Sequence, residues 1–294
     1  MSGTIYTQIA ANKRATVLIV TFFILFISAL AYVLGKAYFG DNPMFYIWAV
    51  GVSIVSGFSG YYYSDKLVLA ASGARELPVS ESEYVHNLVE NLCIGAGLPK
   101  PKVYVIDSPA INAFATGRDP NNSAICFTTG IIEKLDKLEL EGVIAHELSH
   151  IGNYDIRLMA VVGVLVGSIT ILFDMFFRMN MFRSSNRDNK GGSIFLILGI
   201  VMLIISPIVA TLIKLAISRN REYLADSSAA LLTRYPKGLA DALAKIAGDE
   251  SILATADTAT AHLFIANPFK SSAFRSLFDT HPPIEERIKR LNAM

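Results

Sequence analysis

Four long apolar stretches without charged residues constrain this chain more than any other feature of its sequence. Residues 15–34 and 44–63 each have the roughly 20 residues that an α-helix needs to cross the hydrocarbon core of a bilayer. Residues 194–213 have the same length, whereas residues 158–173 are fewer. We therefore expect a membrane protein that opens with a transmembrane hairpin over residues 1–63.

The first stretch predicts a retained anchor and not a cleaved signal peptide. It is longer than a typical signal-peptide core, and no A-x-A-like cleavage site follows it cleanly. The third stretch admits three interpretations, a span, a re-entrant segment or a buried helix, of which we favour the span. Together with the fourth stretch it would form a second hydrophobic hairpin over residues 158–213.

Lys and Arg residues near the ends of these stretches indicate the orientation. More of them flank the side that carries both termini, so the termini and residues 64–157 are expected to face the cytoplasm. The loop 178–193 conflicts with this orientation, because its four basic residues would then face outside.

Composition excludes several classes of protein. The chain is 52% hydrophobic and 17% charged, which rules out a disordered chain, and its two cysteines rule out a disulfide scaffold. A net charge of +1 gives no electrostatic case for binding nucleic acid. The polar regions 64–157 and 214–294 lie on the same predicted side and are expected to form one domain interrupted by the second hairpin.

Local patterns predict both helices and strands in this domain. Capping-box patterns at residues 80–83 and 136–139 each precede a helix, the first of which should end near residues 95–97. Short strands are expected where β-branched and aromatic residues gather between turn residues, at residues 102–107, 112–117 and 124–128.

The helix that follows residue 136 contains the pattern H-E-x-x-H, at His146, Glu147 and His150. Residues four apart lie on one face of a helix, so both imidazoles can reach one zinc ion. Glu147 would then lie close enough to take a proton from the attacking water. The alternative is a pair of exposed or hydrogen-bonded histidines without a metal.

A catalytic zinc site needs a third protein ligand, and the pattern supplies only two. The candidates are His86, His262, His281 and the carboxylates. Glu222 and Asp226 are again four apart on an expected helix. Glu222 could face the metal while Asp226 orients a ligand histidine, or the two could belong to a solvated charge cluster beside the membrane.

Four motifs together resemble one known family. The segments HELSH at 146–150, REYLAD at 221–226, HPPIEER at 281–287 and NAFATG at 112–117 are similar to those of the HtpX family of bacterial membrane zinc metalloproteases. That family is related to the eukaryotic prenyl-protein endoproteases. The resemblance implies a membrane α-helical protein with an α+β, zincin-like metalloprotease domain, in which a small sheet lies beside the H-E-x-x-H helix.

The resemblance also implies cofactor, location and role. One Zn²⁺ per chain would be held by His146, His150 and Glu222. The protein would be a multi-pass protein of the bacterial inner membrane with its active site facing the cytoplasm. It would cleave membrane or misfolded proteins in stress-related quality control, with a functional link to the FtsH protease.

For several further residues we weigh a role in catalysis or substrate binding against a purely structural role. His281 could donate to the oxyanion of the reaction, with Tyr223 as the rival donor, or it could be structural. In relatives the strand matching NAFATG lies beside the cleft, so Asn112 and Ala113 could hold a substrate added as a strand; Asn112 could instead cap a turn. Two residues are assigned to structure, Glu286 and Arg287.

Two other functions compete with the endopeptidase. The first is a catalytically silent zinc-binding membrane scaffold or chaperone, against which the presence of Glu147 argues, since a scaffold needs no base. The second is a transporter or channel component, against which the absence of paired ionisable residues in the apolar stretches argues.

Overall fold

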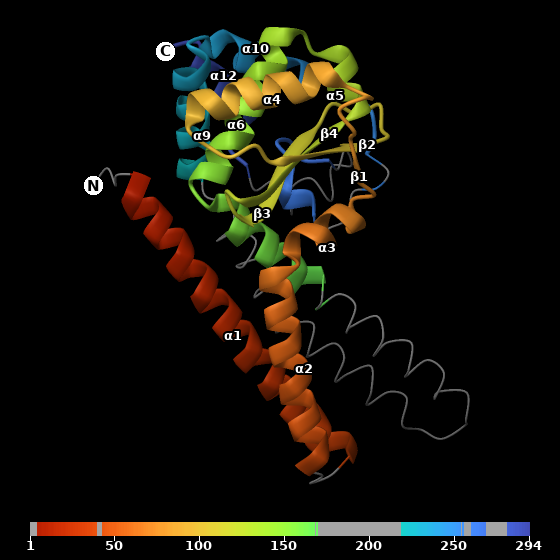
Figure 1. The fold of residues 1–294 in the computed structure, drawn as a ribbon. Coiled ribbons are helices and arrows are strands. Elements are labelled where there is room, and N and C mark those ends of the chain that lie inside the picture. The colour runs from red at the N-terminus through yellow and green to blue at the C-terminus, as the bar shows by residue number, and fades with distance from the viewer. Residues whose placement is uncertain are drawn as a thin grey trace.

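The computed structural model describes residues 5–39, 43–167, 169, 219–253, 255, 260–268 and 281–294. These residues form a domain of helices around a small sheet, from which two long helices extend (Figure 1). The fourth apolar stretch and the loop 178–193 lie outside the described residues.

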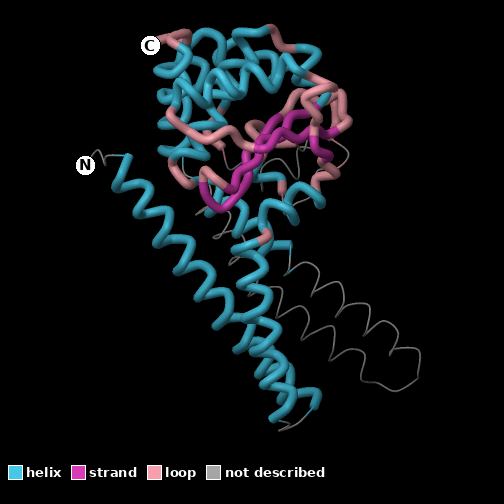
Figure 2. The backbone as a smooth tube through the Cα atoms, in the orientation of Figure 1, coloured by secondary structure: helices cyan, strands magenta, loops and turns pink. Residues whose placement is uncertain are grey.

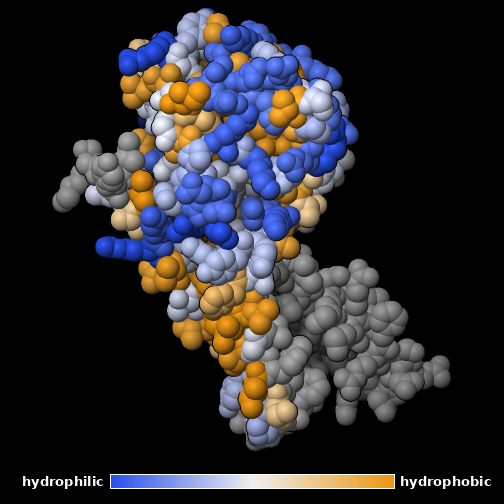
Figure 3. Space-filling model, in the orientation of Figure 1, coloured by the Kyte–Doolittle hydropathy of each residue, from blue (hydrophilic) through white to orange (hydrophobic). Residues whose placement is uncertain are grey.

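The two long helices come from the first two apolar stretches. Helix α1 covers Ile5–Phe39, α2 covers Pro43–Tyr62, and the two pack against each other (Figure 2). One of the described helices, α1, contains a segment that is long and apolar enough to cross a membrane, Ile9–Phe26. In Figure 3 the extending helices are largely hydrophobic, whereas much of the domain surface is hydrophilic. Both stretches are thus helical as expected, while a multi-pass topology stays a prediction.

The domain begins where α2 ends. Its described elements, in chain order, are α3 Ser64–Ala71, β1 Arg75–Glu76, α4 Glu83–Ala96, β2 Lys102–Ile106, β3 Ala113–Asp119, β4 Asn122–Thr128, α5 Thr129–Lys134, α6 Lys137–Gly152, α9 Arg219–Thr233, α10 Pro236–Gly248, the 3₁₀ turn η1 Ala261–Leu263, and α12 Ile284–Leu291. The three strands expected from sequence are therefore present as β2, β3 and β4.

The sheet is mixed, with the strand order β1-β2-β4-β3. Strands β3 and β4 form an antiparallel hairpin, β2 runs parallel to β4, and the short β1 runs antiparallel to β2. Strand β3 is an edge strand of this sheet and packs beside α6. The expected small sheet beside the H-E-x-x-H helix is thus confirmed.

Alternating residues of β4 build a core on each face of the sheet, because successive strand residues point to opposite sides. Ile125 and Phe127 join the larger core, which includes buried residues of α4, α6 and α10. Ala124 and Cys126 join a second core with residues of α3 and of the helical segment 155–167.

Side-chain caps fix where α4 and α6 begin. Asp136 accepts from the backbone N–H of Glu139, whose side chain accepts from the N–H of Asp136, so the second predicted capping box is confirmed. The first is wrong: α4 is capped by Ser82, which accepts from the N–H of Val85. A second serine in the same short segment competes for the cap, and the structure places the helix start two residues later.

The beginning of the third apolar stretch packs inside the protein. Residues 155–167 are helical, and Leu158, Val162 and Leu165 lie in a buried cluster with Ile19 and Phe23 of α1. This part of the chain therefore binds the first long helix to the domain.

Candidate metal centre

Helix α6 presents His146 and His150 on one face, one helical turn apart. Both side chains are buried, and their Nε2 atoms face each other at 3.2 Å. This separation is what one shared ion requires, because two nitrogens each about 2.0–2.1 Å from a tetrahedral zinc ion lie about 3.3 Å apart.

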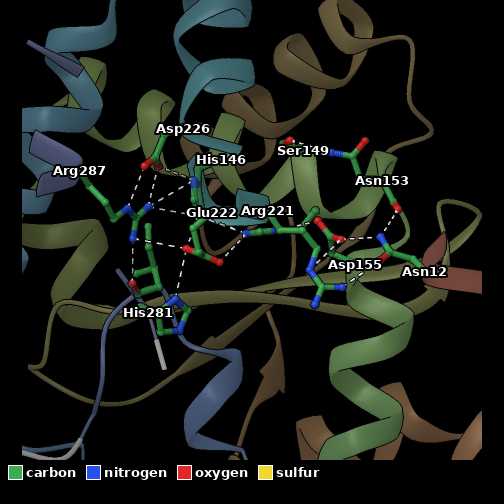
Figure 4. Close-up of polar contacts among 12 residues, drawn as sticks. Asn12, His146, Ser149, Asn153, Asp155, Arg221, Glu222, Asp226, His281 and Arg287 are labelled. Atoms are coloured by element: carbon green, nitrogen blue, oxygen red, sulfur yellow. Dashed lines mark hydrogen bonds and ion pairs between the residues drawn. The ribbon is translucent and has the colours of Figure 1, made fainter. Parts of the chain in front are cut away.

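Helix α9 brings the third side chain to this pair. Oxygens of Glu222 lie 3.8 Å from Nε2 of His146 and 3.6 Å from Nε2 of His150. The potential ligand atoms of the three residues all lie within 4.8 Å of one another, and all three residues are buried. Figure 4 shows Glu222 pointing toward His146 from the neighbouring helix. The interpretation of Glu222 as part of a solvated cluster is therefore wrong.

Each histidine is held on its other ring nitrogen by a carboxylate. Nδ1 of His146 lies 3.0 Å from Asp226, and Nδ1 of His150 lies 3.0 Å from Asp155. A carboxylate partner holds the N–H on Nδ1, which directs the lone pair of Nε2 toward the shared position. Asp226 thus lies beside His146, which is the neighbour that its proposed supporting role requires.

Arg287 completes the shell around Glu222 and Asp226, although sequence reasoning assigned it only to structure. Its side chain is fully buried, at 0% exposed, and donates to both oxygens of Asp226 at 2.9 and 2.7 Å. Its Nη1 lies 3.5 Å from Oε2 of Glu222. Glu286 instead pairs with Arg290 on the surface, as expected of a structural pair.

These contacts set the charges of the site. Burial would raise the pKa of Glu222, but the neighbouring side chains of His281, His150 and Arg287 hold it well below its usual range. Burial likewise opposes ionisation of Asp226, yet Arg287 and His146 lower its pKa to about 2. Both carboxylates are therefore anionic at neutral pH.

The pKa values of His150 and Glu147 are raised, in contrast to those of Glu222 and Asp226. Burial lowers the pKa of His150, but the hydrogen bond with Asp155 and the charge of Glu222 outweigh it and raise the pKa to about 9. Burial raises the pKa of Glu147, and the neighbouring histidines offset this only in part. A carboxyl group with a raised pKa takes a proton more readily than an exposed one, which suits a general base.

The donor set fits a zinc ion. Two imidazole nitrogens and one carboxylate form a common catalytic zinc set with an open fourth position. Within the described chain, the buried Oε2 of Glu222 accepts no hydrogen bond, although Arg287 and His281 lie nearby. A metal ion held between the two histidines would give this oxygen a direct ligand bond.

The other histidine candidates divide between the site and the core. Nδ1 of His281 lies 3.2 Å from Oε2 of Glu222, so this residue reaches the site. His86 and His262 are buried elsewhere, where their Nε2 atoms lie 2.8 and 2.9 Å from the backbone oxygens of Leu77 and Met159. Burial lowers the pKa of His262 to about 4, which keeps it neutral.

Asn112 and Ala113 are engaged with the chain's own backbone. The side chain of Asn112 donates to the carbonyl of Ala266 at 3.0 Å and accepts from the N–H of Ala113. The carbonyl of Ala113 accepts from the N–H of Ile265 at 2.9 Å. These contacts favour a structural role for Asn112 over direct contact with a substrate, because the groups in question already have partners.

A second polar cluster lies beside His150, and sequence reasoning missed the place of Asn12 in it. Arg221 donates to Oδ1 of Asn12 in α1 at 2.8 Å and lies 3.9 Å from Asp155. Figure 4 shows Asn12 and Arg221 on either side of Asp155. Residues so distant in sequence leave no spacing signal.

A histidine pair on one helix, completed by a glutamate from another and set beside a small mixed sheet, is the arrangement of a peptidase. The chain belongs to peptidase family M48, whose sequence model matches residues 79–294. The solved structure of Ste24p from S. mikatae shares the fold, with a TM-score of 0.50 and 18% identity over 97% of this chain and 67% of that one.

Relatives that match nearly the whole length of the chain show which members of family M48 it resembles. The Protease HtpX homolog of Dictyoglomus turgidum is 45% identical over 293 residues, covering 99% of this chain and 95% of the relative. That of Caldanaerobacter subterraneus subsp. tengcongensis is 43% identical over 296 residues, covering 99% and 98%. Within family M48 the chain therefore belongs to the HtpX proteases, as its motifs indicated.

Proposed function

We propose that this chain is an integral membrane, zinc-dependent endopeptidase. The observation that carries the proposal is the convergence of His146, His150 and Glu222 within 4.8 Å, with Glu147 buried beside them. A zinc ion held there would act as a Lewis acid. It would polarise a substrate carbonyl and lower the pKa of water, so that the water can lose a proton and attack near neutral pH.

The residues of the chain would divide the remaining work. Glu147 takes the proton from the attacking water and returns it to the leaving amine, for which its raised pKa suits it. Asp226 and Asp155 hold the two imidazoles in the orientation that ligation needs. His281 is the proposed donor to the oxyanion, and its place next to Glu222 supports that role.

The substrate would be an extended polypeptide that adds along β3, because β3 ends the sheet and lies beside α6. Asn112 and Ala113 would support this edge by fixing its first residues to segment 265–266. The zincin-like character of the domain belongs to the same proposal.

The location and biological role also remain proposals. The apolar segment of α1 supports a membrane anchor. A multi-pass topology in the bacterial inner membrane, with a cytoplasmic site, is proposed from the four apolar stretches, the Lys and Arg residues near their ends and the family resemblance. The lipid bilayer and polypeptide substrates, membrane proteins among them, are the expected partners. A role in stress-related quality control and a functional link to FtsH follow from the family resemblance.

The test compares Glu147→Gln with Glu141→Gln, a substitution of the same kind at a half-buried residue of the same helix whose carboxylate pairs with Lys137. Loss of the general base should lower the rate of casein digestion by about 10²- to 10⁴-fold, while zinc content stays near one ion per chain. Glu141→Gln should cleave at the rate of the unmodified chain. Equal rates for both variants would refute the mechanism, and a zinc-loaded wild type without activity would favour the silent scaffold.

A further inference from the structure

Asn12 is a polar residue of α1 whose side chain is inserted into the domain. It is 5% exposed and lies just before the apolar stretch that begins at residue 15. A buried amide needs hydrogen-bond partners, because leaving it unpaired costs about 1–3 kcal/mol. The hydrogen-bond partners of the Asn12 amide therefore indicate its role.

Among the described residues, every partner of the Asn12 side chain belongs to the surroundings of the metal centre. Its Nδ2 donates to Oδ1 of Asp155 at 2.6 Å and to the carbonyl of Asn153 at 3.0 Å. Its Oδ1 accepts from Nη1 of Arg221 at 2.8 Å. The two ends of the amide thus match an anionic acceptor on one side and a cationic donor on the other (Figure 4).

Both contacts lead directly to proposed metal ligands. The other oxygen of Asp155 lies 3.0 Å from Nδ1 of His150, so one carboxylate is shared between Asn12 and a ligand. Arg221 is the residue before Glu222 on α9, so its guanidinium is tied to the helix that carries the third ligand. One side chain of α1 therefore touches the supports of ligands from both α6 and α9.

We propose that Asn12 is a positioning residue of the metal centre, and that α1 is a working part of the catalytic unit as well as a membrane anchor. The inference rests on the proposed function, because it takes His150 and Glu222 as ligands. Asn12 fixes the carboxylate of Asp155, Asp155 fixes the imidazole of His150, and Arg221 couples the same amide to α9. Displacement of α1 would then lower the affinity of the site for zinc.

The experiment measures the affinity of the full-length chain for zinc, in detergent micelles, by competition with a chelator. The variants are Asn12→Ala, Asn12→Leu, which keeps the branched shape of the side chain but removes its hydrogen-bonding groups, and Asp155→Asn. The matched control is Thr16→Val, because Thr16 is buried one turn further along α1 and its hydroxyl donates to the backbone carbonyl of Asn12 at 2.9 Å, away from the amide group. Melting temperatures of the metal-free proteins show whether each variant is folded.

Removal of a group that orients a metal ligand commonly lowers metal affinity by about 10- to 100-fold, and we expect this for Asp155→Asn. Asn12→Ala and Asn12→Leu act one contact further out and should lower it by about 3- to 10-fold. Because both residues act through the same imidazole, adding Asn12→Leu to Asp155→Asn should change the affinity little further. Thr16→Val should bind zinc as the unmodified chain does.

Three outcomes would overturn the inference. Zinc affinity of Asn12→Leu within twofold of the unmodified chain would show that the amide does not position the site. Independent, multiplicative losses for the two substitutions would show that Asn12 does not act through Asp155. Failure of the unmodified chain to bind zinc would refute the proposed function itself, and the inference with it, so the two failures are distinguishable.

Discussion

At the scale of single residues, the proton on His150 is the charge that a metal must displace. The pKa of this imidazole is raised to about 9, since Asp155 and Glu222 outweigh the opposing effect of burial. In the metal-free protein the ring is therefore protonated at neutral pH, and a zinc ion competes with that proton for Nε2.

Zinc affinity should consequently rise with pH. Between pH 6.5 and 9 each bound ion releases about one proton, so the association constant should increase about tenfold per pH unit and level off above pH 9. Chelator competition at a series of pH values measures this slope. In Asp155→Asn the raising partner is gone, so the slope should flatten at a lower pH; an unchanged profile would contradict the assignment.

The residues of the site differ in how far sequence could predict them. His146, His150 and Glu147 follow from spacing on one helix, and Glu222 followed from the family motif once spacing alone left two interpretations open. Arg287 was assigned to structure, yet it bonds Asp226 from another helix. Its contacts with Asp226 and Glu222, like those of Asn12, exist only after folding, so no local pattern announces them.

At the scale of elements, α6 is held at the correct depth by close packing against α10. A Cβ atom on Gly142 of α6 would lie 2.7 Å from the backbone N of Leu239, and one on Gly238 of α10 would lie 2.5 Å from the carbonyl oxygen of Leu138. The two backbones therefore approach each other through glycine, and the histidine-bearing helix cannot shift without opening this contact.

Gly142→Ala should thus destabilise the protein despite the better helix propensity of alanine. Overpacking of this kind costs about 1–3 kcal/mol, which exceeds the gain of about 1 kcal/mol or less from propensity. Gly248→Ala is the control, because no atom lies within 4 Å of a Cβ at the end of α10. Denaturant unfolding of both variants would decide, and equal stabilities would contradict the packing argument.

Sequence predicted the strands β2, β3 and β4 and the helices α4, α6 and α9, but not the remaining described elements of the domain. Strands β2, β3 and β4 carry β-branched and aromatic residues between turns, so their sequence identifies them. Strand β1 has two charged residues, Arg75 and Glu76, which have no strand pattern of their own; they form a strand because they pair with β2. The apolar third stretch reads alike as a span or a core helix, and its beginning packs against α1.

At the scale of the whole molecule, the candidate metal centre joins two parts of the chain that are separated in sequence by the second hydrophobic hairpin, residues 158–213. Helices α6 and α9 pack together, with two proposed ligands on one and the third on the other. A bound zinc ion would therefore act as a cross-link within the domain, and its binding energy would stabilise the folded state.

Removal of the metal should lower the melting temperature of the full-length protein. A ligand present at about 1,000 times its dissociation constant stabilises the folded state by about 4 kcal/mol. Thermal unfolding before and after chelation measures the loss, which added Zn²⁺ should reverse and Mg²⁺ should not, since Mg²⁺ prefers oxygen ligands. His146→Ala should show no response to the chelator; a full response in that variant would contradict the ligand assignment.

The order of the ligands along the chain has a consequence for the protein during its own synthesis. A ribosome that has just completed α6 has produced both histidines and the glutamate between them, but still has to translate 60 or more residues before Glu222 emerges. The nascent chain thus holds an incomplete set of the proposed ligands while its later apolar stretches are still being synthesised. A peptidase with this order of ligands would have no complete metal site, and so no activity toward its neighbours or itself, until its synthesis is nearly finished.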